Sequence, residues 1–139
     1  MSLPASRALS TPVTVEFEDV DAFGIVNHAC LVSYLERARM RLVAQSGLDL
    51  TFPDAVPVVY ELHVRYQRPL RLFDQLEVSV WVAQVDDYQL GLKYRVRRAE
   101  HTVAVARTTI AFADRETGRL VPAPAEVASL AAALGRGEA

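Results

Sequence analysis

Cysteine is almost missing from this sequence. Its 139 residues include one, Cys30, so no disulfide bond can form within the chain. A reducing cytoplasm is the simplest setting for such a chain, and we expect a cytoplasmic location. Residues 1–12 lack the basic start and the long apolar run of a secretory signal. No apolar run approaches the roughly 18 residues of a membrane span, so we expect no span either.

An excess of positive charge is missing as well. The formal net charge is −2 and the pI is about 5.9, which argues against nucleic acid as a partner. The histidines, His28, His63 and His101, show no short-range ligand spacing, so we predict no metal site. The sequence contains neither a glycine-rich phosphate loop nor a G-x-S-x-G nucleophile elbow. The usual signatures of metal, phosphate-loop and serine-hydrolase chemistry are therefore absent.

The chain does have enough apolar material for a core. Hydrophobic residues make up 51% of the sequence, and 139 residues is the length of one ordinary domain. We therefore predict a single domain over residues 1–139. Residues 1–11 are expected to be a flexible lead and residues 135–139 a frayed tail.

Alternating apolar and polar residues predict the strands of this domain. The alternating or β-branched runs fall at residues 13–17, 58–66, 76–82, 90–96 and 102–113. After the first run, apolar residues recur at helical spacing from about Asn27 to Gly47, and an alanine-rich helix is expected over residues 125–134. Short turns join the later strands, so they should run antiparallel.

These elements predict a two-layer α+β domain, in which one long helix covers one face of an antiparallel sheet. The other face of the sheet, which includes Trp81, has no obvious cover within the chain. Pairing with a second subunit is a natural solution for an uncovered face. We therefore expect a homo-oligomer.

The densest group of potentially catalytic residues lies between the first strand and the long helix. Asp19, Asp21, Asn27 and His28 fall there around the turn residue Gly24. The first N–H groups of a helix have no internal acceptors and carry partial positive charge. A carboxylate facing such donors is the arrangement that acyl transfer needs, with a base or nucleophile opposite an oxyanion site.

Other roles for the same residues stay open at this point. A carboxylate just before a helix is more often a cap or a turn residue than a catalyst. An isolated histidine such as His28 is more often a packed or a surface residue than a catalytic one. A cysteine in the position of Cys30 is more often a small buried apolar residue than a nucleophile. A helix N-terminus can, however, lower the pKa of a thiol and so activate it.

Two motifs resemble the 4-hydroxybenzoyl-CoA thioesterase family of hotdog-fold acyl-CoA thioesterases. They are Asp19-x-Asp21-x-x-Gly24-x-Val26-Asn27-His28-Ala29, continuing to Tyr34-x-Glu36-x-Ala38-Arg39, and Val64-x-Tyr66-x-x-Pro69-Leu70-x-x-x-Asp74-x-Leu76. The resemblance spans roughly residues 13 to 130. It implies a hotdog fold, in which a five-stranded antiparallel sheet wraps a long central helix and the sheets continue across a dimer.

The resemblance also implies an activity, the hydrolysis of an acyl-CoA thioester to a free acid and CoA. Asp21 falls on the family's catalytic aspartate, which acts as a nucleophile or as a general base for water. His28 falls where a backbone N–H polarises the thioester carbonyl, and its imidazole is a further contact to substrate or water. No cofactor is implied, because CoA is part of the substrate. Tyr34 is expected in the core, and Asp19 is expected to be solvated or to stabilise the turn.

Further substrate contacts are implied near Asp21. Gly24, Val26 and Asn27 belong to the matching motif around the turn and the helix start. Glu36 falls where some family members place an acid facing the acyl pocket. It is equally well placed for an ion pair with Arg39, at a spacing of three residues along the helix, and both readings stay open.

The resemblance places the active sites between two subunits, in a homodimer or a homotetramer. Tyr60, Glu61 and His63 are then candidate contacts from the partner chain, although a simple role on the strand face is as good an explanation. The basic residues Arg65, Arg68 and Arg71 are suited either to CoA phosphates or to a solvated sheet edge; the solvated edge is slightly favoured.

Two alternative functions remain. One is a thioesterase for acyl groups bound to an acyl carrier protein. The other is a hotdog module that binds acyl-CoA without hydrolysing it. A hotdog dehydratase is less favoured, because the sequence shows no dehydratase-type Asp and His pattern.

Overall fold

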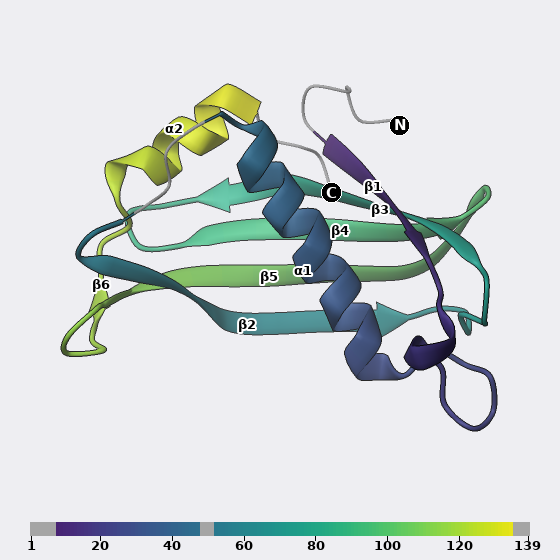
Figure 1. The fold of residues 1–139 in the computed structure, drawn as a ribbon. Helices are drawn as coiled ribbons and strands as arrows, with labels where there is room; N and C mark the ends of the chain where they lie inside the picture. Colours follow the sequence, from purple (N-terminus) through teal and green to yellow (C-terminus); the bar gives the residue numbers. More distant parts are fainter. Residues whose placement is uncertain (1–7, 48–51, 135–139) are drawn as a thin grey trace.

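The protein is a two-layer α+β domain, in which one long helix lies across one face of a curved sheet (Figure 1). The computed structural model describes residues 8–47 and 52–134. In chain order its elements are β1 (Ala8–Thr14), η1 (Phe17–Asp19), α1 (His28–Gln45), β2 (Ala55–Tyr66), β3 (Gln75–Val85), β4 (Leu90–Arg98), β5 (His101–Asp114), β6 (Leu120–Val121) and α2 (Ala125–Leu134).

The sheet is antiparallel throughout, with the order β1-β3-β4-β5-β2, and the short β6 pairs with β5. The long strands are those that the sequence predicts, and β6 is an addition of Leu120–Val121. Consecutive strands β3, β4 and β5 are neighbours, whereas α1 separates β1 from β2 in the chain. This order leaves β1 and β2 at the two edges of the sheet. No helix within residues 8–47 and 52–134 is long and apolar enough to cross a membrane.

The helix α1 forms as the sequence predicts. Its buried residues recur at spacings of three and four, which places them on the face toward the sheet: Leu31, Tyr34, Leu35, Ala38 and Leu42. Asn27 caps the first turn, because its side chain accepts a hydrogen bond from Ala29 N–H at 2.9 Å. Gly47, just beyond the end, takes the left-handed φ of 72° that closes many helices.

The hydrophobic core lies between α1 and the sheet. Alternate residues of β3 and β4 face the helix, namely Val78, Val80 and Val82 with Leu92, Tyr94 and Val96. These side chains are at most 2% exposed. The Tyr94 and Thr108 hydroxyls share a hydrogen bond of 2.9 Å, so these buried polar atoms are paired. The core therefore fixes α1 over the middle of the sheet.

The first strand differs from the prediction. Residues 8–11 belong to β1 rather than to a flexible lead, because β1 pairs with β3 from Ala8 onward. The predicted strand over 13–17 ends early, since Phe17 lies in η1 and is 77% exposed. The cause is a capping box, in which Glu16 N–H donates to Asp19 Oδ2 at 3.0 Å and turns the chain. Residues 1–7, and with them the rest of the predicted lead, lie outside the described residues, as does the predicted tail.

Candidate active site

The segment between η1 and α1 is a closed turn, which hangs beyond the sheet below the start of α1 (Figure 1). Asp21 N–H donates to Ile25 O at 2.8 Å, and Gly24 N–H donates to Asp21 O at 3.0 Å. Gly24 has a φ of 74°, a left-handed conformation that glycine adopts without strain. An isolated bridge between Val20 and Val26 closes the turn at its base. The turn is therefore held by its own backbone.

The Asp21 carboxylate helps to shape this turn. Its Oδ1 accepts hydrogen bonds from Phe23 N–H at 2.8 Å and from Ile25 N–H at 3.2 Å. Its Oδ2 has no hydrogen-bond partner within the described part of the chain, and the residue is exposed. One oxygen thus orients the side chain while the other faces no competing donor. The turn role that the sequence left open is present, and it leaves a carboxylate oxygen available for chemistry.

The turn is attached to the rest of the fold on both sides. Val26 N–H donates to Leu70 O at 2.8 Å, and Ile25 forms an isolated bridge with Arg71. Asn27 N–H donates to Asp19 O at 2.9 Å. These bonds fix the turn to the segment after β2 and to the end of η1, so Asp21 has a defined position relative to the start of α1.

The start of α1 carries the unpaired donor that the sequence predicts. Asn27 Oδ1 takes the Ala29 N–H, and Asn27 O takes the Cys30 N–H at 2.9 Å. The backbone N–H of His28 has no acceptor within residues 8–47 and 52–134. The His28 side chain is exposed, and Cys30 is half-buried. An N–H at a helix start with no protein acceptor is suited to polarise a carbonyl oxygen.

A buried tyrosine connects α1 to η1. Tyr34, in the core as predicted and 1% exposed, donates its hydroxyl to Asp19 Oδ2 at 2.7 Å. Burial raises the pKa of the Tyr34 hydroxyl well above its usual range, and the bond to Asp19 raises it further, so Tyr34 stays a donor. The Asp19 carboxylate therefore holds the backbone of η1, through Glu16 N–H, and the helix α1, through Tyr34. The clue in the sequence is that a tyrosine on the buried face of a helix needs a partner for its hydroxyl.

Sequence reasoning missed Tyr66 at this site. Its hydroxyl donates to His28 O at 2.9 Å, and burial raises the pKa of that hydroxyl. A hollow of about 240 Å³ lies beside this bond, lined by Ile25, Val26, Tyr66, Gln67, Arg68, Pro69 and Leu70. Of the residues predicted to bind substrate, Val26 therefore does line a hollow next to the turn. Arg68 brings a positive charge to the same hollow.

Glu36 is placed away from this turn. It forms an ion pair with Arg39 at 3.6 Å, and its side chain is 67% exposed. Of the two readings left open, the ion pair is the one that the structure shows. A separate apolar hollow of about 320 Å³ lies between α1, α2 and the sheet, with Met40 and Val58 in its wall and Glu36 outside it.

Tyr60, Glu61 and His63 all lie exposed on β2. Tyr60 sits at an irregularity, because the pairing of β2 with β5 shifts between Val59 and Glu61. Within the described ranges, no hydrogen bond or ion pair joins these residues to Asp21 or His28. Among the same residues, no group of three or more His, Cys, Asp or Glu side chains could hold a metal ion.

Within the described residues, the site thus combines the turn between η1 and α1, a carboxylate with one unpaired oxygen and a helix-start N–H without an acceptor. Residues 15–131 match the thioesterase-like superfamily. The chain belongs to this superfamily. Membership confirms the predicted family, the hotdog fold and the predicted class of thioester hydrolases.

Named relatives of this thioesterase-like protein agree with the match. The acyl-CoA thioester hydrolase YbgC of Shigella flexneri is 35% identical over 95 residues, which are 66% of this chain and 71% of that protein. A 1,4-dihydroxy-2-naphthoyl-CoA hydrolase of Thermosynechococcus vestitus is 33% identical over 101 residues, 68% of each chain.

A solved structure supports the fold alone. The 1,4-dihydroxy-2-naphthoyl-CoA thioesterase of Synechocystis superposes with a TM-score of 0.80 at 17% identity, over 88% of this chain and 94% of that one. At this identity the likeness concerns the arrangement of helices and strands. It confirms that the long helix and antiparallel sheet of the thioesterase-like protein have the hotdog arrangement.

Proposed function

We propose that this protein is an acyl-CoA thioesterase, which hydrolyses an acyl-CoA to a free acid and CoA. The observation that carries the proposal is the Asp21 carboxylate, whose Oδ1 is fixed by the turn and whose Oδ2 is unpaired within the described residues. The relatives named for thioester hydrolysis support the same activity. No cofactor takes part, because the CoA is itself the leaving group.

Two routes are open to Asp21. As a general base, it takes a proton from water, the resulting hydroxide attacks the thioester carbonyl, and the CoA thiolate leaves and is protonated. As a nucleophile, it attacks the carbonyl itself, and the CoA thiolate leaves and is protonated. Water then hydrolyses the acyl–aspartyl anhydride, which releases the free acid and restores the Asp21 carboxylate. In both routes the carbonyl oxygen gains negative charge. The unpaired His28 N–H is the donor that we assign to it.

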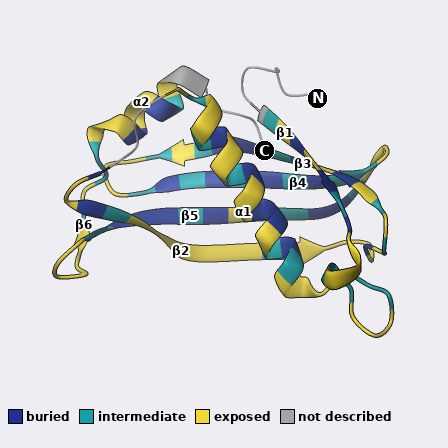
Figure 2. Ribbon diagram, in the orientation of Figure 1, coloured by how far each residue is buried: buried dark blue, intermediate teal, exposed yellow. Residues whose placement is uncertain are grey.

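The proposal includes a second subunit, because β2 is an unprotected edge. Figure 2 shows that most of this strand is exposed. Its exposed apolar residues include Val59 at 48%, Tyr60 at 59% and Leu62 at 38%. A long apolar edge strand favours pairing with another strand. We propose that β2 pairs with β2 of a second copy, in a homodimer or in a homotetramer built from two such dimers.

In such a dimer, Tyr60, Glu61 and His63 reach the site of the partner chain as substrate contacts. On the chain's own side, Val26 and Arg68 line the 240 Å³ hollow, whose wall includes Tyr66, the donor to His28 O. Arg68 is the basic residue placed to meet a negatively charged part of CoA. Each active site then draws its carboxylate from one subunit and part of its acyl pocket from the other.

A substrate panel tests the proposal. The purified protein is assayed with aromatic, short-chain and long-chain acyl-CoAs, and with the preferred acyl group attached to a carrier protein. We expect release of free CoA with at least one acyl-CoA, at a higher kcat/KM than with the carrier-bound form. A much faster reaction with the carrier-bound thioester would favour the carrier-protein alternative. Tight acyl-CoA binding with no turnover across the panel would contradict the enzymatic proposal.

A further inference from the structure

The sheet face opposite α1 carries a hollow of about 390 Å³ at its centre. Its polar lining comes from β2, β3, β4 and β5, and consists of His63, Arg65, Trp81, Lys93, Arg95 and Arg107. The sheet register explains why they meet. Trp81 pairs with Lys93, Lys93 with Arg107, and Arg107 with His63, in a single row across the sheet. We call this cavity the outer hollow.

The outer hollow is strongly cationic. Arg65, Lys93, Arg95 and Arg107 all line it, and no acidic residue does. Within residues 8–47 and 52–134, the ion pairs are Glu36–Arg39 and Asp74–Arg98, so none of the four cations has a carboxylate partner. Like charges directly opposite each other on neighbouring strands, as at Lys93 and Arg107, destabilise a sheet. The protein as a whole has a net charge of −2, so this concentration of positive charge is local.

Trp81 gives a second, independent indication of a ligand-binding site. It is 3% exposed, and it lies outside the core cluster that α1 covers. Its indole N–H is buried and has no hydrogen-bond partner within the described residues. Arg95 lies over the ring, with its guanidinium carbon 5.9 Å from the ring centroid. A buried donor without an acceptor is rare in proteins, and an anionic oxygen in the outer hollow is an acceptor of the right kind.

We propose that the outer hollow binds a small organic polyphosphate, that is, a molecule carrying two or more linked phosphate groups. Four cations match such a multiply charged anion, and arginine forks suit phosphate oxygens. The volume of about 390 Å³ lies in the range of small-molecule sites. Neither Asp21 nor His28 lines the outer hollow, so within one chain it is separate from the proposed catalytic turn; His63, in its wall, is also a contact proposed for the partner's site.

A second copy of the chain is the competing occupant of this face, and the charges argue against it. Two such faces stacked about a two-fold axis would bring the four cations of each copy toward those of the other. That contact buries positive charge against positive charge and leaves the Trp81 N–H without an acceptor. A soluble anion satisfies both groups at once.

Fluorescence titration tests the proposal, because Trp81 is the protein's single tryptophan. Its emission is followed during addition of inorganic pyrophosphate, ADP and, as a singly phosphorylated control, AMP. We expect a saturable change with pyrophosphate and ADP and a much weaker one with AMP. Equal affinity for pyrophosphate and ADP would show that the linked phosphates suffice, and tighter ADP binding would show that the nucleoside is also recognised. No saturable change with either polyphosphate would overturn the proposal.

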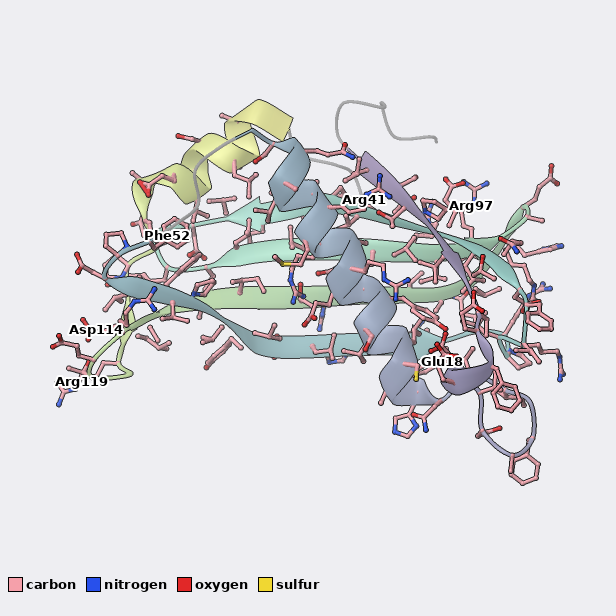
Figure 3. The ribbon with its side chains drawn as sticks, in the orientation of Figure 1. Glu18, Arg41, Phe52, Arg97, Asp114 and Arg119 are labelled. Atoms are coloured by element: carbon pink, nitrogen blue, oxygen red, sulfur yellow. The ribbon has the colours of Figure 1, made fainter. Side chains whose placement is uncertain are left out.

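Matched charge variants show where the anion binds. K93Q/R107Q removes two cations of the outer hollow, and R41Q/R119Q removes two exposed arginines elsewhere, on α1 and after β5 (Figure 3). We expect the first pair to weaken pyrophosphate binding at least about tenfold and the second pair to leave it unchanged. Equal effects of both pairs would overturn the proposal. Melting curves check the fold, and Arg65→Gln, a single exposed change in the outer hollow, replaces the first pair if that pair unfolds.

Sedimentation separates the ligand from a protein partner. If a second copy covers the outer hollow, K93Q/R107Q alters the sedimentation coefficient and pyrophosphate does not bind, which would overturn the proposal. We expect the same coefficient for K93Q/R107Q and wild type. None of these measurements depends on thioester turnover, so they can succeed or fail independently of the proposed thioesterase activity.

Discussion

Asp19 and Asp21 are two positions apart, yet their carboxylates have different surroundings. Asp19 is half-buried, and its Oδ2 accepts from both the Tyr34 hydroxyl and Glu16 N–H, which joins η1 to α1. Asp21 uses Oδ1 for the turn and keeps Oδ2 unpaired within the described residues. The family motif contains both acids. The half-buried Asp19 is thus held by a core tyrosine, whereas the exposed Asp21 is bonded only within its own turn, and we assign the chemistry to Asp21.

Removal of one hydroxyl tests the structural role of Asp19. Tyr34→Phe keeps the buried ring but leaves Asp19 without its side-chain donor, so we expect the free energy of unfolding to fall by about 1–3 kcal/mol. Urea denaturation measures the loss. Tyr88→Phe is the matched control, because Tyr88 is exposed and its hydroxyl has no partner within the described residues. Equal stabilities of the two variants would contradict the assigned role.

Individual residues of the site were predictable where the signal is local. Asp21, Asn27 and His28 follow one another around a single turn, so spacing alone indicated a carboxylate facing a helix start. The bond from Tyr66 to His28 O joins residues 38 positions apart, and it depends on where β2 ends in the sheet. The pairing register of β2 cannot be read from a single sequence. For this reason Tyr66 and the hollow beside it were missed.

At the scale of elements, the start of α1 connects fold and chemistry. Asn27 closes the first turn by capping Ala29 N–H, and its own backbone N–H is bonded to Asp19 O. The cap leaves the next backbone donor, that of His28, without a protein acceptor in the described chain. The residue that ends the turn therefore also determines which N–H faces the site.

Replacement of the cap tests this link. Asn27→Ala removes the side-chain acceptor, and we expect a loss of about 1 kcal/mol in the free energy of unfolding. Asn27→Ser keeps a good capping oxygen, so its stability should stay near wild type. Thermal or urea unfolding measures both variants, and kcat for an acyl-CoA should fall more in the alanine variant. If alanine and serine behave alike, the cap does not position the helix start.

The elements themselves were predictable in different degrees. The strong alternation of Val78, Val80 and Val82 identified β3, and the helical spacing of Leu31 to Leu42 identified α1. The start of β1 was missed, because residues 8–11 show little alternation and form a strand through pairing with β3. The two residues of β6 carry too little pattern to be recognised.

At the scale of the whole molecule, the edge strand β2 exposes most of its residues, several of them large and apolar. Between Val58 and Tyr66, β2 presents large apolar side chains to solvent, and as an edge strand it also has one side without a partner strand. A monomer with such an edge is prone to association. The proposed dimer covers it, and it brings residues of β2 to the active site of the partner.

Charges placed on this edge test the proposed assembly. We expect wild type to sediment at no less than twice the chain mass of 15.4 kDa. V59E/L62E places like charges on both copies and should yield monomers with little thioesterase activity. The control A44E/A128E adds the same charge to exposed helix positions and should remain an active oligomer. A fully active monomeric wild type would rule out a shared site.

We propose that the Asp21 carboxylate carries out thioester hydrolysis. Asp21→Asn is the most direct test, because asparagine keeps an oxygen that can accept from Phe23 and Ile25 N–H while losing the charge. Glu18→Gln is the matched control, since Glu18 is an exposed acid of η1 (Figure 3) whose side chain has no bond within the described residues.

The measurement is kcat for the best acyl-CoA of the panel, with melting curves to show that both variants fold. We predict that Asp21→Asn lowers kcat at least about 100-fold and that Glu18→Gln stays near wild type. A folded Asp21→Asn protein that hydrolyses this acyl-CoA at the wild-type rate would contradict the account.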